Sequence, residues 1–240
     1  MAKLKWAKAK FGFAPHGIVE LTYWKNKIEP VKLLEAHSKR YTPIHLIDSR
    51  PVMTTYDFGP YKLVSRNYSK QNDFPYLWRN LLDLVKKKSA IAEMPVARIC
   101  YKDGTAEIIS IWRKNTRELS GFLTDEKIKY ELKEKALVTA AKSLAKLHAA
   151  GYTHNHAHLG NFVTHPSGET HLVDYTSINK IGEKGGKNDL NALFTKTREV
   201  LGLRFSTVPA SKDIRRLFEQ DIIGKMQQVY EKQFETSKRT

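Results

Sequence analysis

The sequence predicts an α+β protein with a strand-rich first half and a helical second half. Between residues 52 and 112, short segments rich in strand-forming residues alternate with turn residues, a pattern typical of antiparallel hairpins. From residue 124 onward, apolar residues recur at the spacing of amphipathic helices. The segment 113–119 connects the halves. We therefore expect a strand-rich lobe at 1–116, which includes an accessory N-terminal segment, and a helical lobe at 117–240.

The first half is expected to contain two helices and two hairpins. In order, the predicted elements are a helix at 31–38, strands at 52–58 and 61–65, a helix at 74–85, and strands at 96–101 and 106–112. Pro30 suits the first turn of the first helix. Asp103-Gly104 in the second hairpin is the strongest short turn signal. Residues 4–41 as a whole are expected to form the accessory segment.

The second half is expected to be helical around one short hairpin. Predicted helices cover residues 124–150, 188–201 and 211–234. Ser211 is a suitable N-cap for the last of them, and Gly151 offers the left-handed backbone that ends the first. Strands at 161–163 and 171–173 flank the turn Pro166-Ser167-Gly168.

This hairpin presents two side chains that carry oxygen atoms. Asn161 lies at the start of one strand, and Asp174 follows the end of the other. Amide and carboxylate oxygens held side by side are hard ligands, which Mg²⁺ prefers when it also holds phosphates. Taken alone, each residue could instead serve a turn.

The segment 147–178 resembles the catalytic core of the protein-kinase-like superfamily. In that superfamily a His-x-Asp triplet is followed five residues later by a metal-binding Asn, and a strand then leads to an Asp that binds Mg²⁺. The pattern falls on His154-Asn155-His156, on Asn161 and on Asp174-Tyr175-Thr176. The stretch HLGNFV looks most like bacterial lipopolysaccharide core kinases and the related toluene-tolerance-type proteins. The resemblance is specific over residues 140–189, looser from about 52 to 120, and absent from the first fifty residues.

The resemblance implies a two-lobed protein-kinase-like fold that uses ATP and Mg²⁺. Asn161 and Asp174 would hold the metal. Lys62 resembles the strand lysine that pairs with the ATP phosphates, and Arg66 is its rival. Trp112 and Arg117 would line the hinge near the adenine. The acceptor implied by the resemblance is a sugar hydroxyl of the lipopolysaccharide core.

Two further residues have structural roles in this comparison. His154 matches a buried histidine that packs against the backbone at the metal-binding Asp. Asp189 matches an Asp that braces the catalytic loop. Its alternative is a carboxylate placed at a helix N-terminus, where the helix dipole favours negative charge.

The sequence departs from the kinase pattern in three places. His156 stands where the catalytic base Asp is expected, although imidazole can also act as a base near neutral pH. The helix at 74–85 contains no Glu to meet the strand lysine, so Asn80 or Asp83 would have to serve. The phosphate-covering loop has only Gly59. A pseudokinase that binds nucleotide or a partner without phosphate transfer is therefore the second interpretation.

A metal site of another kind is a further alternative. His154, His156 and His158 alternate along the chain, and alternate residues of an extended backbone face the same side. Three imidazoles could hold zinc, copper or iron.

The charge of the chain suggests an anionic partner. Lys and Arg total 41 against 25 Asp and Glu, which gives a net charge of +16. A lipopolysaccharide-type substrate, another phosphate-rich partner, an anionic membrane face or nucleic acid would each fit. With nucleic acid, the protein would resemble the atypical kinases of ribosome or tRNA maturation. Solvated surface lysines are the simplest alternative.

Composition also predicts where the protein works. The single Cys100 excludes an internal disulfide and a cysteine-rich zinc site. No apolar run is long enough for a transmembrane helix, and the N-terminus lacks the sustained apolar core of a secretory signal. A cytoplasmic setting is expected, with peripheral contact at the inner membrane face as an option.

Overall fold

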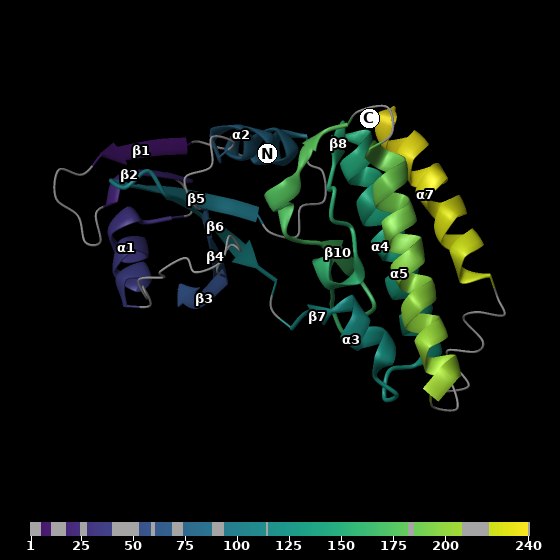
Figure 1. The fold of residues 1–240 in the computed structure, drawn as a ribbon. Helices are drawn as coiled ribbons and strands as arrows, with labels where there is room; N and C mark the ends of the chain where they lie inside the picture. Colours follow the sequence, from purple (N-terminus) through teal and green to yellow (C-terminus); the bar gives the residue numbers. More distant parts are fainter. Residues whose placement is uncertain are drawn as a thin grey trace. The chain divides into compact units, whose positions relative to one another are not determined.

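The computed structural model describes residues 6–10, 18–24, 28–39, 53–58, 61–68, 74–87, 94–113, 115–181, 185–207 and 221–239. The chain forms two compact units. The first comprises Met1–Trp78 and Glu93–Lys114, and the second comprises Arg79–Ala92 and Asn115–Thr240. The first carries the larger sheet and the second carries most of the helices (Figure 1), so the α+β prediction is confirmed.

A six-stranded antiparallel sheet forms the first unit, with the strand order β1-β2-β5-β6-β4-β3. Its strands are β1 (Trp6–Lys10), β2 (Ile18–Trp24), β3 (Met53–Phe58), β4 (Tyr61–Tyr68), β5 (Met94–Tyr101) and β6 (Ala106–Trp112). The two predicted hairpins are β3–β4 and β5–β6. In the second of them, Gly104 has the positive φ of +83° that its turn requires.

Strands β1 and β2 were not predicted. They belong to the region expected to be an accessory segment, and they extend the sheet because β2 pairs with β5. β1 lies at the edge, where Lys8 and Lys10 are exposed. Lysines on an edge strand oppose pairing with another chain. After Trp6 the strand consists of alternating Ala and Lys, which have little strand propensity, so only the pairing with β2 reveals β1.

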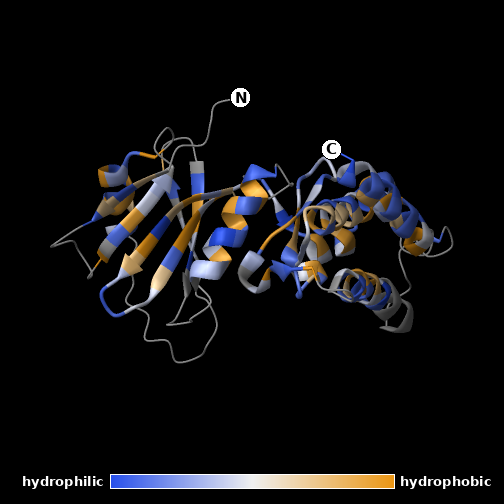
Figure 2. Cartoon of the chain, turned by 90° about the horizontal axis from the view of Figure 1, so that it is seen from above, coloured by the Kyte–Doolittle hydropathy of each residue, from blue (hydrophilic) through white to orange (hydrophobic). Residues whose placement is uncertain are grey.

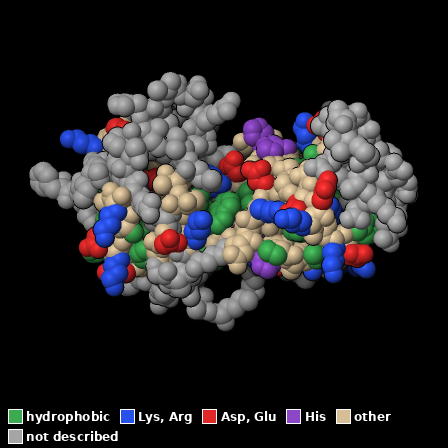
Figure 3. Space-filling model, turned by 90° about the horizontal axis from the view of Figure 1, so that it is seen from below, with side chains coloured by type: hydrophobic (Ala, Val, Ile, Leu, Met, Phe, Trp, Pro, Cys, Tyr) green, Lys and Arg blue, Asp and Glu red, His purple; other side chains and the backbone are tan. Residues whose placement is uncertain are grey.

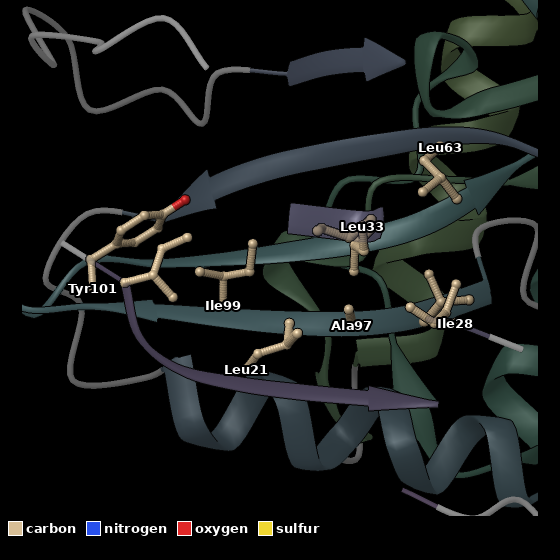
Figure 4. Packing of buried hydrophobic residues seen from close by; sticks show 10 residues of the cluster. Leu21, Ile28, Leu33, Leu63, Ala97, Ile99 and Tyr101 are labelled. Atoms are coloured by element: carbon tan, nitrogen blue, oxygen red, sulfur yellow. The ribbon is translucent and has the colours of Figure 1, made fainter. Parts of the chain in front are cut away.

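Helix α1 (Pro30–Ser38) forms where it was predicted, with Pro30 in its first turn. It contributes Leu33 to a core made with residues of β2, β4 and β5 (Figure 4). The labelled side chains of this core are Leu21, Ile28, Leu33, Leu63, Ala97, Ile99 and Tyr101. His37 of α1 also pairs with the buried Glu107 at 2.8 Å, so a polar contact and an apolar one fix the helix.

Helix α2 (Phe74–Lys86) belongs to both units. Its predicted apolar positions Leu77, Leu81, Leu84 and Val85 are buried. The spacing of these residues therefore identified the buried side of the helix.

The prediction of one long helix at 124–150 is wrong for its first residues. Thr124 ends α3 (Leu119–Thr124), and α4 (Tyr130–Ala149) begins six residues later. The Asp125 side chain accepts the backbone N–H of Lys127 at 2.8 Å. Such local bonds offer the backbone an alternative to the helix, and apolar spacing alone does not reveal them.

The remaining elements of the second unit are short strands and two long helices. They are β7 (Arg117–Glu118), β8 (Tyr152–Thr153), η2 (Leu159–Asn161), β9 (Phe162–Thr164), β10 (Thr170–Leu172), η3 (Tyr175–Ser177), β11 (Asn179–Lys180), α5 (Gly185–Thr207) and α7 (Ile222–Lys238). The hairpin β9–β10 and both helices overlap their predicted positions. Residues 211–220, including Ser211 as the expected N-cap, lie outside the described residues.

Hydrophobic and hydrophilic residues share the same strands and helices, as expected of elements that bury one side (Figure 2). In the described part of the face drawn in Figure 3, Lys and Arg side chains are interspersed with Asp and Glu. The excess positive charge is therefore dispersed on this face. No helix within the described ranges is long and apolar enough to cross a membrane.

Candidate active site

The kinase-like motif begins where α4 ends. Gly151 has a φ of +88°, so it turns the chain out of the helix at the predicted position. Its carbonyl accepts the N–H of Ile181 at 2.8 Å, and β8 then pairs with β11. The chain that leads into the motif and the chain that leaves it are thus bonded to each other.

His154 is fully buried and is engaged on two sides. Its Nε2 lies 2.9 Å from the carbonyl oxygen of Val173, to which it donates. Its backbone N–H donates to Oδ2 of Asp189 at 2.6 Å. Asp189 also accepts from Nε2 of His148 at 3.1 Å. The resemblance to protein kinases implied that His154 packs against the backbone at Asp174 and that Asp189 braces the loop. The contacts agree with both roles.

Burial fixes the charge of His154. Because burial disfavours an imidazolium ion, the pKa of the His154 side chain lies below its usual value. The ring therefore stays neutral at physiological pH and keeps one N–H for the Val173 carbonyl.

The lowered pKa of His154 predicts how folding stability changes with pH. Protonation near the usual pKa of about 6.5 takes place in the unfolded chain and not in the folded one. The contribution of His154 is thus complete above that pH and declines as the pH falls toward the lower folded value. We expect a flatter dependence of the free energy of unfolding in His154→Gln between pH 7 and 5, measured by urea titration. Equal slopes in both proteins would contradict this.

The two proposed metal ligands lie next to each other in the backbone hydrogen-bond pattern. The N–H of Val173 donates to the carbonyl of Asn161 at 2.8 Å, so Asp174 directly follows the residue bonded to Asn161. The Asn161 side-chain N–H₂ donates to the carbonyl of His156 at 2.8 Å. That bond uses the amide nitrogen and leaves the amide oxygen as the group that could serve a cation.

Asp174 has an uncommon backbone conformation, with φ +60° and ψ +70°. Asp and Asn tolerate this left-handed region better than other non-glycine residues. Its side chain is partly exposed. A non-glycine residue held in this region is often found at a functional site.

His156 and His158 are exposed, and their ring centroids lie 6.2 Å apart. Nδ1 of His158 accepts the N–H of Gly160 at 3.2 Å. His154, by contrast, is buried and bonded to Val173. The three-histidine metal site is therefore wrong, and no group of three or more His, Cys, Asp or Glu among the described residues is arranged to hold a metal. The alternation failed as a guide because this loop is not a regular strand.

Side-chain bonds hold the segment that follows Asp174. Asn155, with a φ of +64°, donates from Nδ2 to the carbonyl of Ser177 at 2.7 Å. Asn80 of α2 donates to the carbonyl of Ile178 at 3.3 Å. Asn155, which lies between His154 and His156, thus helps to hold the segment after Asp174, a role that the sequence did not suggest.

Asp83, the other candidate to replace the helix Glu, accepts from Tyr152 at 2.7 Å and pairs with Lys87 at 2.9 Å. The bond from Lys87, followed by that from Tyr152, lowers the pKa of the Asp83 carboxyl. Both candidates lie in the part of α2 that belongs to the second unit, and they bond to Ile178 and Tyr152 of the same unit. These partners were not foreseen from the sequence.

The predicted nucleotide-binding residues lie on different elements. Lys62 of β4 and Trp112 of β6 are direct cross-strand partners, so their side chains leave the same face of the sheet. Arg66, the rival of Lys62, is buried. Arg117 of β7 pairs with Asp125 at 2.8 Å and lies over the ring of Phe122 at 5.1 Å.

The fold has relatives among solved structures. WaaP, from a structure of its complex with acyl carrier protein, has a TM-score of 0.55 and 18% identity, over 86% of this chain and 97% of that chain. A divergent kinase lacking the glycine-rich loop, which regulates membrane ultrastructure of the Toxoplasma parasitophorous vacuole, has a TM-score of 0.52 and 17% identity, over 79% of this chain and 80% of that chain. No protein-family model matches the sequence, and no curated protein matches it.

Proposed function

Because the chain has a protein-kinase-like fold, we propose that it is a phosphotransferase that moves the γ-phosphate of ATP to a hydroxyl group. The observation that carries this proposal is the bond from the Val173 N–H to the Asn161 carbonyl. It aligns Asn161 with Asp174, the two residues that the kinase pattern assigns to the metal. The neutral His154 supports the proposal, because it bonds the backbone immediately before Asp174.

In this proposal Asn161 and Asp174 hold Mg²⁺. An amide oxygen and a carboxylate are a suitable pair for a hard cation that also binds phosphate oxygens. When bound, Mg²⁺ neutralises charge on the phosphates during transfer. Lys62 would bind a phosphate, and Trp112, its cross-strand partner, would lie near the adenine with Arg117.

His156 takes the position of the catalytic base. Its side chain is exposed, so an acceptor hydroxyl can reach it. A neutral imidazole can orient that hydroxyl and accept its proton. The backbone carbonyl of His156 also accepts a hydrogen bond from the Asn161 side-chain amide. In this proposal His156 therefore supplies the base through its side chain and orients a metal ligand through its backbone.

We propose an anionic sugar of the lipopolysaccharide core type as the acceptor. The resemblance of HLGNFV to lipopolysaccharide core kinases supports this class, and the net charge of +16 suits a phosphate-rich substrate. Transfer of labelled phosphate to dephosphorylated lipopolysaccharide core, and not to a neutral oligosaccharide, is the expected result.

Calorimetric titration with ATP, with and without Mg²⁺, tests the metal site. Asp174→Asn removes the charge and keeps a side chain that tolerates the left-handed backbone. We expect Mg²⁺-dependent ATP affinity to fall at least about tenfold, which corresponds to the loss of about 1.4 kcal/mol. Asp103→Asn, in the exposed turn of β5–β6, is the matched control. Equal Mg²⁺-dependent affinity in both variants would refute the metal role of Asp174.

The pseudokinase remains a second candidate because of one structural observation. Asp83, which could have replaced the missing helix Glu, is bonded to Tyr152 and Lys87. Under this alternative, the wild-type protein binds ATP with Mg²⁺ and transfers no phosphate to any acceptor or to water. Turnover by the wild-type protein would exclude it.

A further inference from the structure

The C-terminal helix α7 packs along α4 through residues spaced four apart. Ile222 and Met226 are buried, and α4 is the element that α7 contacts most. Lys225 of α7 also pairs with Glu134 of α4 at 2.8 Å. The next residue in the series is Tyr230, which follows Met226 by four.

Tyr230 contacts a residue near the end of α4. Its hydroxyl lies 2.6 Å from Nδ1 of His148, and the two rings meet edge to face with centroids 5.6 Å apart. The Tyr230 ring also stacks on the Phe234 ring, with centroids 6.0 Å apart. Burial and, to a smaller extent, the charge of Asp189 raise the pKa of Tyr230 to about 12. The hydroxyl therefore keeps its proton at neutral pH.

The direction of the hydrogen bonds follows from the chemistry of the partners. The Asp189 carboxylate can only accept, so Nε2 of His148 carries the proton that it shares with Asp189 at 3.1 Å. In the neutral ring Nδ1 is then the acceptor, and the Tyr230 hydroxyl donates to it. Asp189 thereby selects the His148 tautomer, and Tyr230 holds the ring from its other nitrogen.

These bonds continue into the candidate active site. Asp189 accepts the backbone N–H of His154 at 2.6 Å, and the His154 ring donates to the carbonyl of Val173, which precedes Asp174. We propose that Tyr230 is a positioning residue that holds His154 and Asp174 in place through His148 and Asp189. This inference rests on the proposed function for its effect on ATP, while its effect on the loop is independent of any activity.

Tyr230→Phe tests the inference, because it keeps the ring packing and removes only the hydroxyl. Three quantities are measured on the full chain. They are the ¹⁵N shifts of the His148 ring, hydrogen exchange at the His154 amide, and calorimetric ATP affinity with and without Mg²⁺. Tyr76→Phe on the exposed side of α2 is the matched control.

We expect the ¹⁵N resonance of His148 Nδ1 to move in Tyr230→Phe, because this nitrogen loses its hydrogen-bond donor, while Nε2 keeps the proton that it shares with Asp189. Exchange at the His154 amide should become about three- to tenfold faster, and Mg²⁺-dependent ATP affinity should fall by a similar factor. ATP affinity without Mg²⁺ should not change. A role of Tyr230 in ring packing alone would leave the His148 Nδ1 resonance at its wild-type position.

A double-mutant cycle checks the route. In a His148→Gln background, Tyr230→Phe should add no further change at the His154 amide, because the two residues act in series. An additive change would overturn the inference, as would an unaltered His154 amide in Tyr230→Phe. Absence of Mg²⁺-dependent ATP binding in the wild-type protein would refute the proposed function instead, and the His148 ¹⁵N and amide-exchange measurements would still decide this inference.

Discussion

Replacing His156 by alanine is expected to lower the rate of phosphate transfer by about 10²- to 10⁴-fold, the usual contribution of a positioned general base. Binding of ATP with Mg²⁺ should be retained. The reason is that His156 holds the Asn161 amide through its backbone carbonyl, which an alanine also provides. The substitution therefore separates the chemistry of the side chain from the structure of the loop, and the measurement is single-turnover transfer from labelled ATP.

Two further variants make this result specific. His156 is exposed, so added imidazole should reach the gap in His156→Ala and restore part of the rate. His165→Ala, in the turn between β9 and β10 where His165 bonds to Ser167, is the control and should transfer at the wild-type rate. Transfer by His156→Ala that equals the wild-type rate would show that His156 is not the base.

Replacing Asp189 by alanine is expected to reduce the free energy of unfolding of the second unit by about 2–6 kcal/mol, because two buried N–H groups lose their acceptor and each costs about 1–3 kcal/mol. Asp189 is 2% exposed, and its Oδ2 accepts from both His148 and the His154 backbone. Alanine would leave two buried N–H groups without an acceptor, and each such group is costly.

Urea titration followed by far-UV circular dichroism measures this loss, because α4, α5 and α7 of the second unit supply most of the described helix. Asn188→Ala removes the exposed side chain that precedes Asp189 in α5 and should change stability by less than about 0.5 kcal/mol. If both variants unfold at the same urea concentration, Asp189 does not brace the loop.

Much of the second unit could be predicted because its signals are local. Gly151 ends α4, and a short turn joins β9 to β10, as their sequences indicate. Asn161 and Asp174 were identified as partners from their spacing, and the backbone bond between Val173 and Asn161 fits that pairing. The side-chain geometry toward a cation stays a prediction.

Other features depend on residues far apart in the sequence. β1 could be recognised only as the partner of β2, and β2 only as the partner of β5. Nothing in the residues around Tyr230 indicates that it meets His148, which lies 82 positions earlier. Asp83 likewise meets Tyr152 across 69 positions.

The sequence by itself determined the α+β class, the order of most elements, and the hairpin that carries Asn161 and Asp174, because helix spacing, turn residues and short motifs are encoded within a few neighbouring residues. Only the tertiary structure decided that His156 and His158 are exposed and separate from the buried His154, and that His148 and Tyr230 support Asp189. The protonation and direction of these side chains depend on burial and on partners brought together by helix packing, which local sequence does not encode.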